Sequence, residues 1–217
     1  CRLFGIRSRP LLPLLPMTKW QKRIVAFVGV ALLGVAFAWF FVLPRMRPHI
    51  FSGAVIQSNQ NAPRMELDAA NGETVRMTDF EGQVVVVYFG YTFCPDVCPQ
   101  TLSKLAESMD ILGEKASDVQ VIMVSIDPER DTPELLEEYV TYFHPGFIGV
   151  TGDAQTVNRV ATLYGVYYEA QDGTADTGYT IDHTSTVILV DRSGHLKLVL
   201  PFEGTAEQIA ADIEYFL

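Results

Sequence analysis

The chain has 217 residues, enough for one domain of ordinary size with an appendage. Hydrophobic residues make up 48% of it and aromatic residues 11%, which excludes a disordered chain, and its three cysteines are too few for a disulfide scaffold. The net charge of -10 is unevenly spread, because residues 1–49 hold eight basic residues and no acidic one. Residues 50–217 therefore hold eight basic and 26 acidic residues, a charge of -18 that excludes most nucleic-acid binding, which needs Lys and Arg.

Twenty consecutive uncharged residues, 24–43 (IVAFVGVALLGVAFAWFFVL), form one apolar run. As a helix this run is about 30 Å long, which matches the hydrocarbon thickness of a bilayer. Six basic residues precede it and only Arg45 and Arg47 follow it closely, so the positive-inside rule keeps the N-terminus in the cytoplasm and exports the acidic body. The prediction is an uncleaved, single-pass transmembrane signal anchor. Ala36-Phe37-Ala38 leaves a cleaved signal peptide open as the alternative.

The composition predicts four regions along the chain. Residues 1–23 are a basic cytoplasmic leader whose true start we expect at Met17, residues 24–43 the transmembrane anchor, residues 44–63 a proline-containing polar tether, and residues 64–217 the exported domain. A short basic start of this kind favours a bacterial plasma (inner) membrane, with the domain on the periplasmic or extracytoplasmic side. The Arg-rich leader leaves a mitochondrial inner membrane, with the domain facing the intermembrane space, as the alternative.

Hydrophobic periodicity predicts alternating strands and helices in the exported domain. In chain order these are a hairpin around Asn71-Gly72, a buried strand at 83–89, a helix from Pro99, a buried strand at 119–126, a helix capped by Thr132, a short strand at 147–150, a helix at 157–164, a hairpin of 184–190 with 196–200, and a helix at 205–216. This order indicates an α/β fold, a thioredoxin-like mixed sheet with flanking helices.

Two cysteines, Cys94 and Cys98, lie between the first buried strand and the first long helix. Each precedes a proline, which disfavours helical backbone, so Pro99 is predicted at the first helical position, Cys98 at the N-cap and Cys94 on the preceding loop. The helix N-terminus favours a thiolate, so we expect a lowered pKa at Cys98. A thiolate is both a nucleophile and a metal ligand, and the alternative is a buried, inert pair or disulfide.

A third donor, His183, is predicted on the loop before the last hairpin, which faces the cysteines in a thioredoxin-like sheet. Two thiolates and one imidazole suit copper, because thiolates select Cu(I) and a Cys/His mixture also accepts Cu(II). Zinc fits less well, because structural zinc sites close with four ligands. Asp127 and Asp182 are candidates to orient the imidazole, with loop capping as the alternative role.

Three motifs carry a family resemblance: Phe93-Cys94-Pro-Asp-Val-Cys98-Pro99, Ser125-Ile-Asp-Pro-Glu-Arg-Asp-Thr-Pro133 and Asp182-His183-Thr-Ser185. In this order and spacing the chain resembles the Sco/SenC family of copper chaperones for cytochrome c oxidase over nearly all of residues 60–217. The resemblance implies a thioredoxin-like fold in which Cys94, Cys98 and His183 bind copper, as Cu(I), Cu(II) or both. Within the second motif, Glu129-Arg130-Asp131 is predicted to be a solvated charged turn.

The resemblance also implies partners and a second chemistry. Copper would pass to the oxidase subunit that carries the binuclear CuA site, with other copper chaperones or thiol reductants as further partners. Cys94 and Cys98 would act as a redox-active pair that keeps the acceptor cysteines reduced. Two alternatives stay open: a metal-independent thiol-disulfide oxidoreductase or peroxidase, and a redox or copper sensor. His183 separates the first alternative from the copper hypothesis, because a plain dithiol mechanism does not need it.

Overall fold

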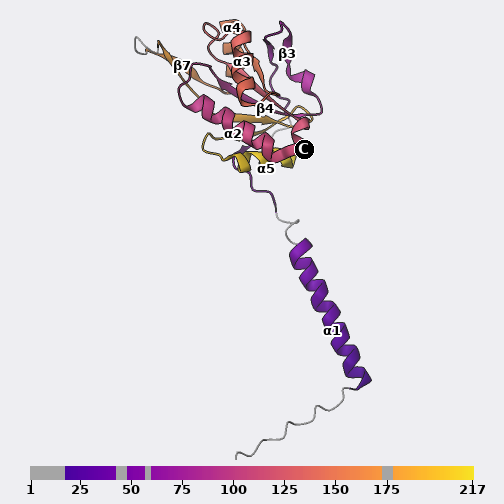
Figure 1. The fold of residues 1–217 in the computed structure, drawn as a ribbon. Helices are drawn as coiled ribbons and strands as arrows, with labels where there is room; N and C mark the ends of the chain where they lie inside the picture. The colour runs from indigo at the N-terminus through magenta and orange to yellow at the C-terminus, as the bar shows by residue number, and fades with distance from the viewer. Residues whose placement is uncertain (1–17, 43–47, 57–59, 173–177) are drawn as a thin grey trace, which may run out of the picture. The chain divides into compact units, whose positions relative to one another are not determined.

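The computed structural model of the protein describes residues 18–42, 48–56, 60–172 and 178–217 (Figure 1). Within it, strand β4, Val84–Gly90, lies inside a six-stranded sheet. The predicted start, Met17, and the residues Leu43, Arg45 and Arg47 lie outside this described part. The chain divides into two compact units, residues 1–49 and residues 50–217, which are described separately.

The described residues of the first unit, 18–42 and 48–49, contain one apolar helix. Helix α1, Lys19–Phe37, continues as a π-helical segment over Ala38–Val42. Thr18 begins it with a capping box, because its side chain accepts from the Gln21 N–H and the Gln21 side chain accepts from the Thr18 N–H. An 18-residue window of the 24 residues Lys19–Val42 has a mean hydropathy of 2.5, and none of the 24 side chains is buried. By length and composition the helix fits a membrane span or a signal sequence.

The sheet of the second unit is mixed. Its strands lie in the order β1-β10-β9-β4-β5-β6. Parallel pairing joins β4 to β5 and β5 to β6, whereas β9 pairs antiparallel with both β4 and β10, and β1 pairs antiparallel with β10 at one edge. All seven residues of β4 are buried, as expected of a strand covered on both faces. The other bounds are β1 Ala54–Val55, β5 Val119–Ser125, β6 Ile148–Val150, β9 Val187–Val190 and β10 Leu196–Leu200.

Helices cover both faces of the sheet (Figure 1). Helices α2 and α5 pack side by side on one face, and α3 and α4 lie on the other. Each helix turns its apolar stripe inward; Leu102, Leu105 and Met109 of α2 are all buried. Their bounds are α2 Val97–Leu112, α3 Pro133–Phe143, α4 Ala154–Leu163 and α5 Ala206–Phe216. The predicted α/β, thioredoxin-like mixed sheet with flanking helices is confirmed.

Two small antiparallel ribbons and two short 3-10 helices complete the described part of the second unit. The predicted hairpin is the ribbon of β2, Glu66–Asp68, and β3, Thr74–Arg76, and its turn contains Gly72 with a φ of 77°. A second ribbon was not predicted: it pairs β7, Tyr168–Gln171, with β8, Thr180–His183. The 3-10 segments are Met77–Phe80 and Gly113–Asp118.

The second unit begins earlier than predicted, because part of the expected tether (44–63) is built into it. Strand β1 lies within that range and pairs with β10. Just before it, the N–H and hydroxyl of Ser52 donate to the buried carboxylate of Asp212 at 3.0 and 2.5 Å. The ring of Phe51 packs against Tyr215 and Phe216. A two-residue edge strand carries no periodic pattern, so the sequence gives no signal for it.

Candidate metal centre

The two cysteines lie where β4 ends and α2 begins. The helix starts at Val97 after Asp96, so Cys98 is its second residue and Pro99 its third; the prediction of Cys98 at the N-cap and Pro99 at the first helical position is wrong by two residues. A proline fits there because the first N–H groups of a helix have no partner within it. Cys98 is fully buried, whereas Cys94 lies on the preceding loop, as predicted, and is partly exposed.

Gly90, the last residue of β4, makes room for the buried sulfur. A Cβ at this position would lie 2.9 Å from the Cys98 Sγ and 2.8 Å from a ring carbon of Tyr88. Neither neighbour can move freely, because both side chains are fully buried. Glycine is therefore required by the packing of the site and not by backbone conformation.

His183 meets the two sulfurs from the other side of the site. Its Nε2 lies 3.6 Å from the Cys98 Sγ, and the donor atoms of Cys94, Cys98 and His183 all lie within 4.8 Å of one another. Bonds of roughly 2.0–2.3 Å from one metal ion place its ligand atoms at most about 4.6 Å apart. Only a small adjustment of the three side chains therefore separates this arrangement from a three-ligand metal site.

The imidazole is oriented by the backbone. His183 is the last residue of β8 and not a loop residue as predicted. Its Nδ1–H donates to the carbonyl of Thr184 at 3.2 Å, because a carbonyl only accepts, and this bond turns Nε2 toward the sulfurs. The rings of Tyr88 and Tyr91 approach the imidazole edge-on, with centroids 6.3 and 6.1 Å away.

The two aspartates expected to orient His183 do not do so among the described residues. Asp182 is exposed on β8. Asp127 is buried, but its carboxylate accepts from Arg130 Nε and from the Tyr179 hydroxyl, both at 2.5 Å. The carbonyl of Thr184 takes the role that the sequence assigns to a carboxylate, because it lies directly beside the ring.

The negative charge belongs to Cys94 and not to Cys98 as predicted. Hydrogen bonding from the Cys98 thiol, from His183 and from the N–H groups of Asp96 and Cys98 lowers the pKa of Cys94 to about 3 against the opposing effect of burial. The Cys98 N–H, one of the free amides at the start of α2, donates to the Cys94 Sγ at 3.4 Å. The neighbouring Cys94 sulfur and burial raise the pKa of Cys98. The pair therefore holds one thiolate and one thiol.

The predicted solvated turn Glu129-Arg130-Asp131 is instead largely buried next to this site. Asp131 is only 1% exposed and hydrogen-bonds Thr92, two residues before Cys94. The Arg130 side chain is 18% exposed, and only Glu129 faces solvent. Sequence reasoning missed Thr92 and Tyr179 as neighbours of the site, and the one available signal was that Arg130 and Asp131 belong to a motif of the family resemblance.

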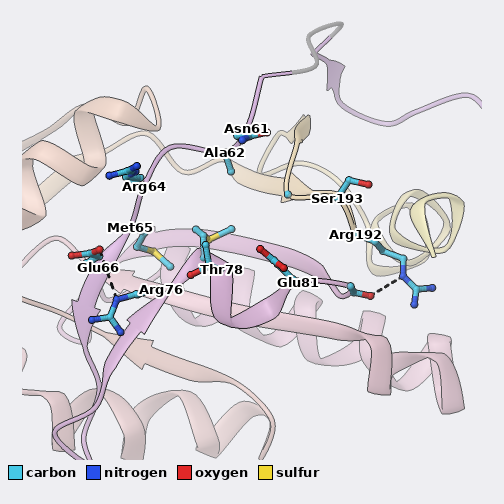
Figure 2. A pocket seen from close by; sticks show the side chains of 13 residues that line it. Asn61, Ala62, Arg64, Met65, Glu66, Arg76, Thr78, Glu81, Arg192 and Ser193 are labelled. Atoms are coloured by element: carbon cyan, nitrogen blue, oxygen red, sulfur yellow. Dashed lines mark hydrogen bonds and ion pairs between the residues drawn. The ribbon is translucent and has the colours of Figure 1, made fainter.

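A surface hollow of about 920 Å³ lies elsewhere and is lined by none of the three donors. It is lined by residues of segments 61–82 and 192–194 (Figure 2). Three of its charged groups already have partners: Arg76 pairs with Glu66 at 3.7 Å, and Arg192 donates to the carbonyl of Gly82 at 2.7 Å. The cysteine–histidine cluster is thus the better candidate for chemistry.

Comparison with known proteins identifies relatives of nearly all of the second unit. The SCO1/SenC family model matches residues 54–217. The SCO2-like protein of Rickettsia felis is 34% identical over 182 residues, covering 81% of this chain and 89% of that protein. The mitochondrial SCO1 homolog of Homo sapiens is 38% identical over 149 residues, covering 68% of this chain and 50% of that protein.

Solved structures agree with this assignment. ScoI of Bradyrhizobium japonicum with copper bound is 36% identical and superposes with a TM-score of 0.66, covering 73% of this chain and all of that one. Yeast Sco1 with copper bound is 27% identical with a TM-score of 0.65, covering 72% of this chain and 87% of that one. With a family match over most of its length and a cysteine pair and histidine gathered at one end of the sheet, this chain belongs to the SCO1/SenC family.

Proposed function

We propose that the protein is a membrane-anchored copper chaperone in which Cys94, Cys98 and His183 bind copper as cargo for cytochrome c oxidase. The observation that carries the proposal is the convergence of two sulfurs and one imidazole nitrogen within 4.8 Å. Thiolates select Cu(I), and the imidazole also makes Cu(II) acceptable. Copper-bound relatives at 36% and 27% identity support copper over zinc.

The proposed acceptor of the copper is argued from the SCO1/SenC family. A similar solved structure, BsSco, is described as a member of the Sco family of cytochrome c oxidase assembly proteins, and we propose that the acceptor is the subunit that carries the CuA site. Partly exposed Cys94 is the sulfur that an acceptor can reach first, because Cys98 is fully buried. Release of copper then proceeds by exchange of one ligand at a time between donor and acceptor cysteines.

The same pair supports a thiol-disulfide reaction with the acceptor, or with another protein. The Cys94 thiolate attacks an acceptor disulfide to form a mixed disulfide, and Cys98 then displaces the acceptor. One acceptor disulfide is reduced to two thiols while Cys94 and Cys98 are oxidised to a disulfide. A metal-independent oxidoreductase is therefore the second candidate function, favoured by the free, unequally exposed cysteine pair.

We place the domain outside the cytoplasm. Helix α1 is long and apolar enough to span a bilayer, and basic residues gather before it. The relatives include proteins of bacteria and mitochondrial proteins of Homo sapiens and Bos taurus. A single-pass anchor in a bacterial plasma membrane, with the mitochondrial inner membrane as the alternative, fits this distribution.

The test is copper titration of the reduced full chain in detergent against a competing chelator. Wild type should bind one copper per chain, and Cys98→Ser and His183→Ala should weaken binding by more than about 100-fold, because loss of even an outer-shell partner costs about 10- to 100-fold. His144→Ala, which changes a histidine on the loop between α3 and β6, is the matched control. Unchanged affinity in His183→Ala would remove histidine from the site, and copper-free reduction of insulin or peroxide would favour the oxidoreductase.

A further inference from the structure

The turn between β5 and α3, residues 125–131, is called here the Ser125–Asp131 turn. It carries two buried carboxylates, Asp127 and Asp131, which are 2% and 1% exposed. Its backbone is closed on itself, because the N–H groups of Arg130 and Asp131 both donate to the carbonyl of Asp127, at 3.2 and 2.9 Å. A buried carboxylate is stable only when it accepts several hydrogen bonds, so the hydrogen-bond partners of Asp127 and Asp131 identify the segments that the turn positions.

One side of the turn holds the cysteine loop. The carboxylate of Asp131 accepts the backbone N–H of Thr92 at 3.0 Å and the hydroxyl of Thr92 at 2.5 Å, and it also accepts the hydroxyl of Ser125 at 2.6 Å. Thr92 lies two residues before Cys94 in the loop that leaves β4. Burial raises the pKa of Asp131 and these hydrogen bonds oppose the rise. The loop is thus tied to the turn at both backbone and side chain.

The other side of the turn holds the segment that leads to His183. Arg130 Nη1 donates to the carbonyl of Tyr179 at 2.9 Å, and the Tyr179 hydroxyl donates to Asp127 at 2.5 Å. The guanidinium also stacks on the Tyr179 ring at 3.6 Å from its centroid, and its Nε pairs with Asp127. Tyr179 immediately precedes β8, whose last residue is His183.

Aromatic residues join the two sides across the same guanidinium. Arg130 lies 4.9 Å from the ring centroid of Phe93, on the cysteine loop, as well as over Tyr179. Tyr91, at the start of that loop, accepts the N–H of Ile181 in β8 through its hydroxyl at 3.1 Å. The cysteine loop and the segment that leads to His183, which are far apart in the sequence, therefore meet at this turn.

We infer that the Ser125–Asp131 turn is a two-sided clamp that positions the site: Asp131 sets the place of Cys94 through Thr92, and Arg130 with Asp127 sets the place of His183 through Tyr179. The inference rests on the proposed function for its copper readouts only. Cys98 needs no such clamp, because it is held within α2 and against Gly90. Asp131 and Arg130 are positioning residues, because they act through Thr92 and Tyr179 and are not among the three candidate ligands.

The test compares Asp131→Ala and Arg130→Lys with Glu129→Gln, a charge change at the exposed position of the same turn, in the full chain in detergent. Copper affinity should fall by about 10- to 100-fold in the first two variants and stay unchanged in the third. With Cu(II), Asp131→Ala should shift the thiolate-to-copper absorption band and keep the imidazole nitrogen hyperfine coupling. Arg130→Lys should weaken that coupling and keep the band.

Gentler variants separate positioning from folding. Thr92→Val removes one hydroxyl of similar size and should reproduce the band shift of Asp131→Ala, and Thr92→Ser should restore the wild-type band. Circular dichroism at the temperature of the titration confirms that each variant is folded. A lower melting temperature with wild-type spectra and affinity in both Asp131→Ala and Arg130→Lys would overturn the clamp and leave only a stabilising role.

A metal-free readout keeps the clamp distinguishable from the copper proposal. In the reduced protein, Asp131→Ala should change the alkylation rate of Cys94, and Arg130→Lys should shift the ring ¹⁵N resonances of His183. If wild type bound no copper, the proposed function would fail while these shifts still supported the clamp. If neither metal-free signal moved, the clamp would fail whatever the copper affinity.

Discussion

At the scale of single residues, the two sulfurs of the site differ in pKa because they differ in burial and in hydrogen bonding. Cys94 receives a helix N-terminal amide and remains partly exposed, whereas Cys98 is enclosed by Gly90 and Tyr88. An amide at a helix N-terminus stabilises a thiolate, and an apolar enclosure destabilises one. The nucleophilic sulfur and the protonated one are therefore fixed by position and not by residue type.

This inequality predicts the pH dependence of thiol labelling. Because the pKa of Cys94 is lowered to about 3, iodoacetamide should label Cys94 at pH 5 to 7, well below the range of an ordinary thiol, while Cys98 stays unlabelled as the internal control. The stability contribution of the Cys94 thiolate is complete above its unfolded pKa of 9.0 and is lost as the pH falls toward 3. Mass spectrometry of the adducts measures the labelling of each cysteine at each pH, and a Cys94 labelling midpoint near pH 9 would contradict the lowered pKa.

At the scale of elements, α3 begins directly after the Ser125–Asp131 turn, and its cap is separate from the clamp. The Thr132 side chain accepts the N–H of Leu135 at 3.3 Å, and Pro133 occupies the first helical position, as predicted. The cap stabilises the helix, whereas the bonds of Asp131 reach away from it to Thr92. Neighbouring residues in the chain thus have separable effects on stability and on the site.

Thr132→Ala should lower the free energy of unfolding by about 1 kcal/mol, because an unsatisfied N–H remains at the start of α3. Urea denaturation of residues 50–217 measures the loss, and Thr132→Ser, which keeps the hydroxyl, should recover most of it. The copper spectra should be those of wild type. A changed thiolate band in folded Thr132→Ala would show that the cap and the clamp are not independent.

At the scale of the whole molecule, charge and hydropathy divide the chain into two units of opposite character. The first 49 residues are basic and contain the apolar helix, whereas residues 50–217 carry a charge of -18 and contain the sheet and its covering helices. The proposed anchor would hold the copper domain at the membrane in which the oxidase lies. Partner encounter would then occur within a surface layer and not in free solution.

Membrane extraction tests the anchor. The full chain should stay in the membrane fraction after an alkaline carbonate wash, because about 20 apolar residues must leave the bilayer for it to be released. Residues 50–217 expressed alone for export should appear in the soluble fraction as the control. A shortened, soluble product from the full chain would support a cleaved signal peptide and end the anchor proposal.

Local pattern accounts for most of the predicted elements. The unbroken apolar run of β4 and the helical spacing of Leu102, Leu105 and Met109 are readable because burial of a strand or helix face leaves a periodic trace. The β7–β8 ribbon has no periodic hydrophobic pattern, since its short strands are partly exposed and are separated by several residues in the sequence. The predicted start of α2 is wrong by two residues because the preference of proline for the first turn of a helix does not specify which residue of that turn it occupies.

By itself, the sequence determined the apolar helix, the order of strands and helices, and the cysteine pair between a buried strand and a helix, since these depend on neighbours within a few residues. Only the tertiary structure decided that His183 lies 3.6 Å from Cys98, that Cys94 holds the charge, and that Arg130 and Asp131 are turned inward. The reason is that Cys98 and His183 are 85 residues apart, so their contact depends on the packing of distant segments. A local sequence pattern does not specify which distant group buries a side chain or hydrogen-bonds to it.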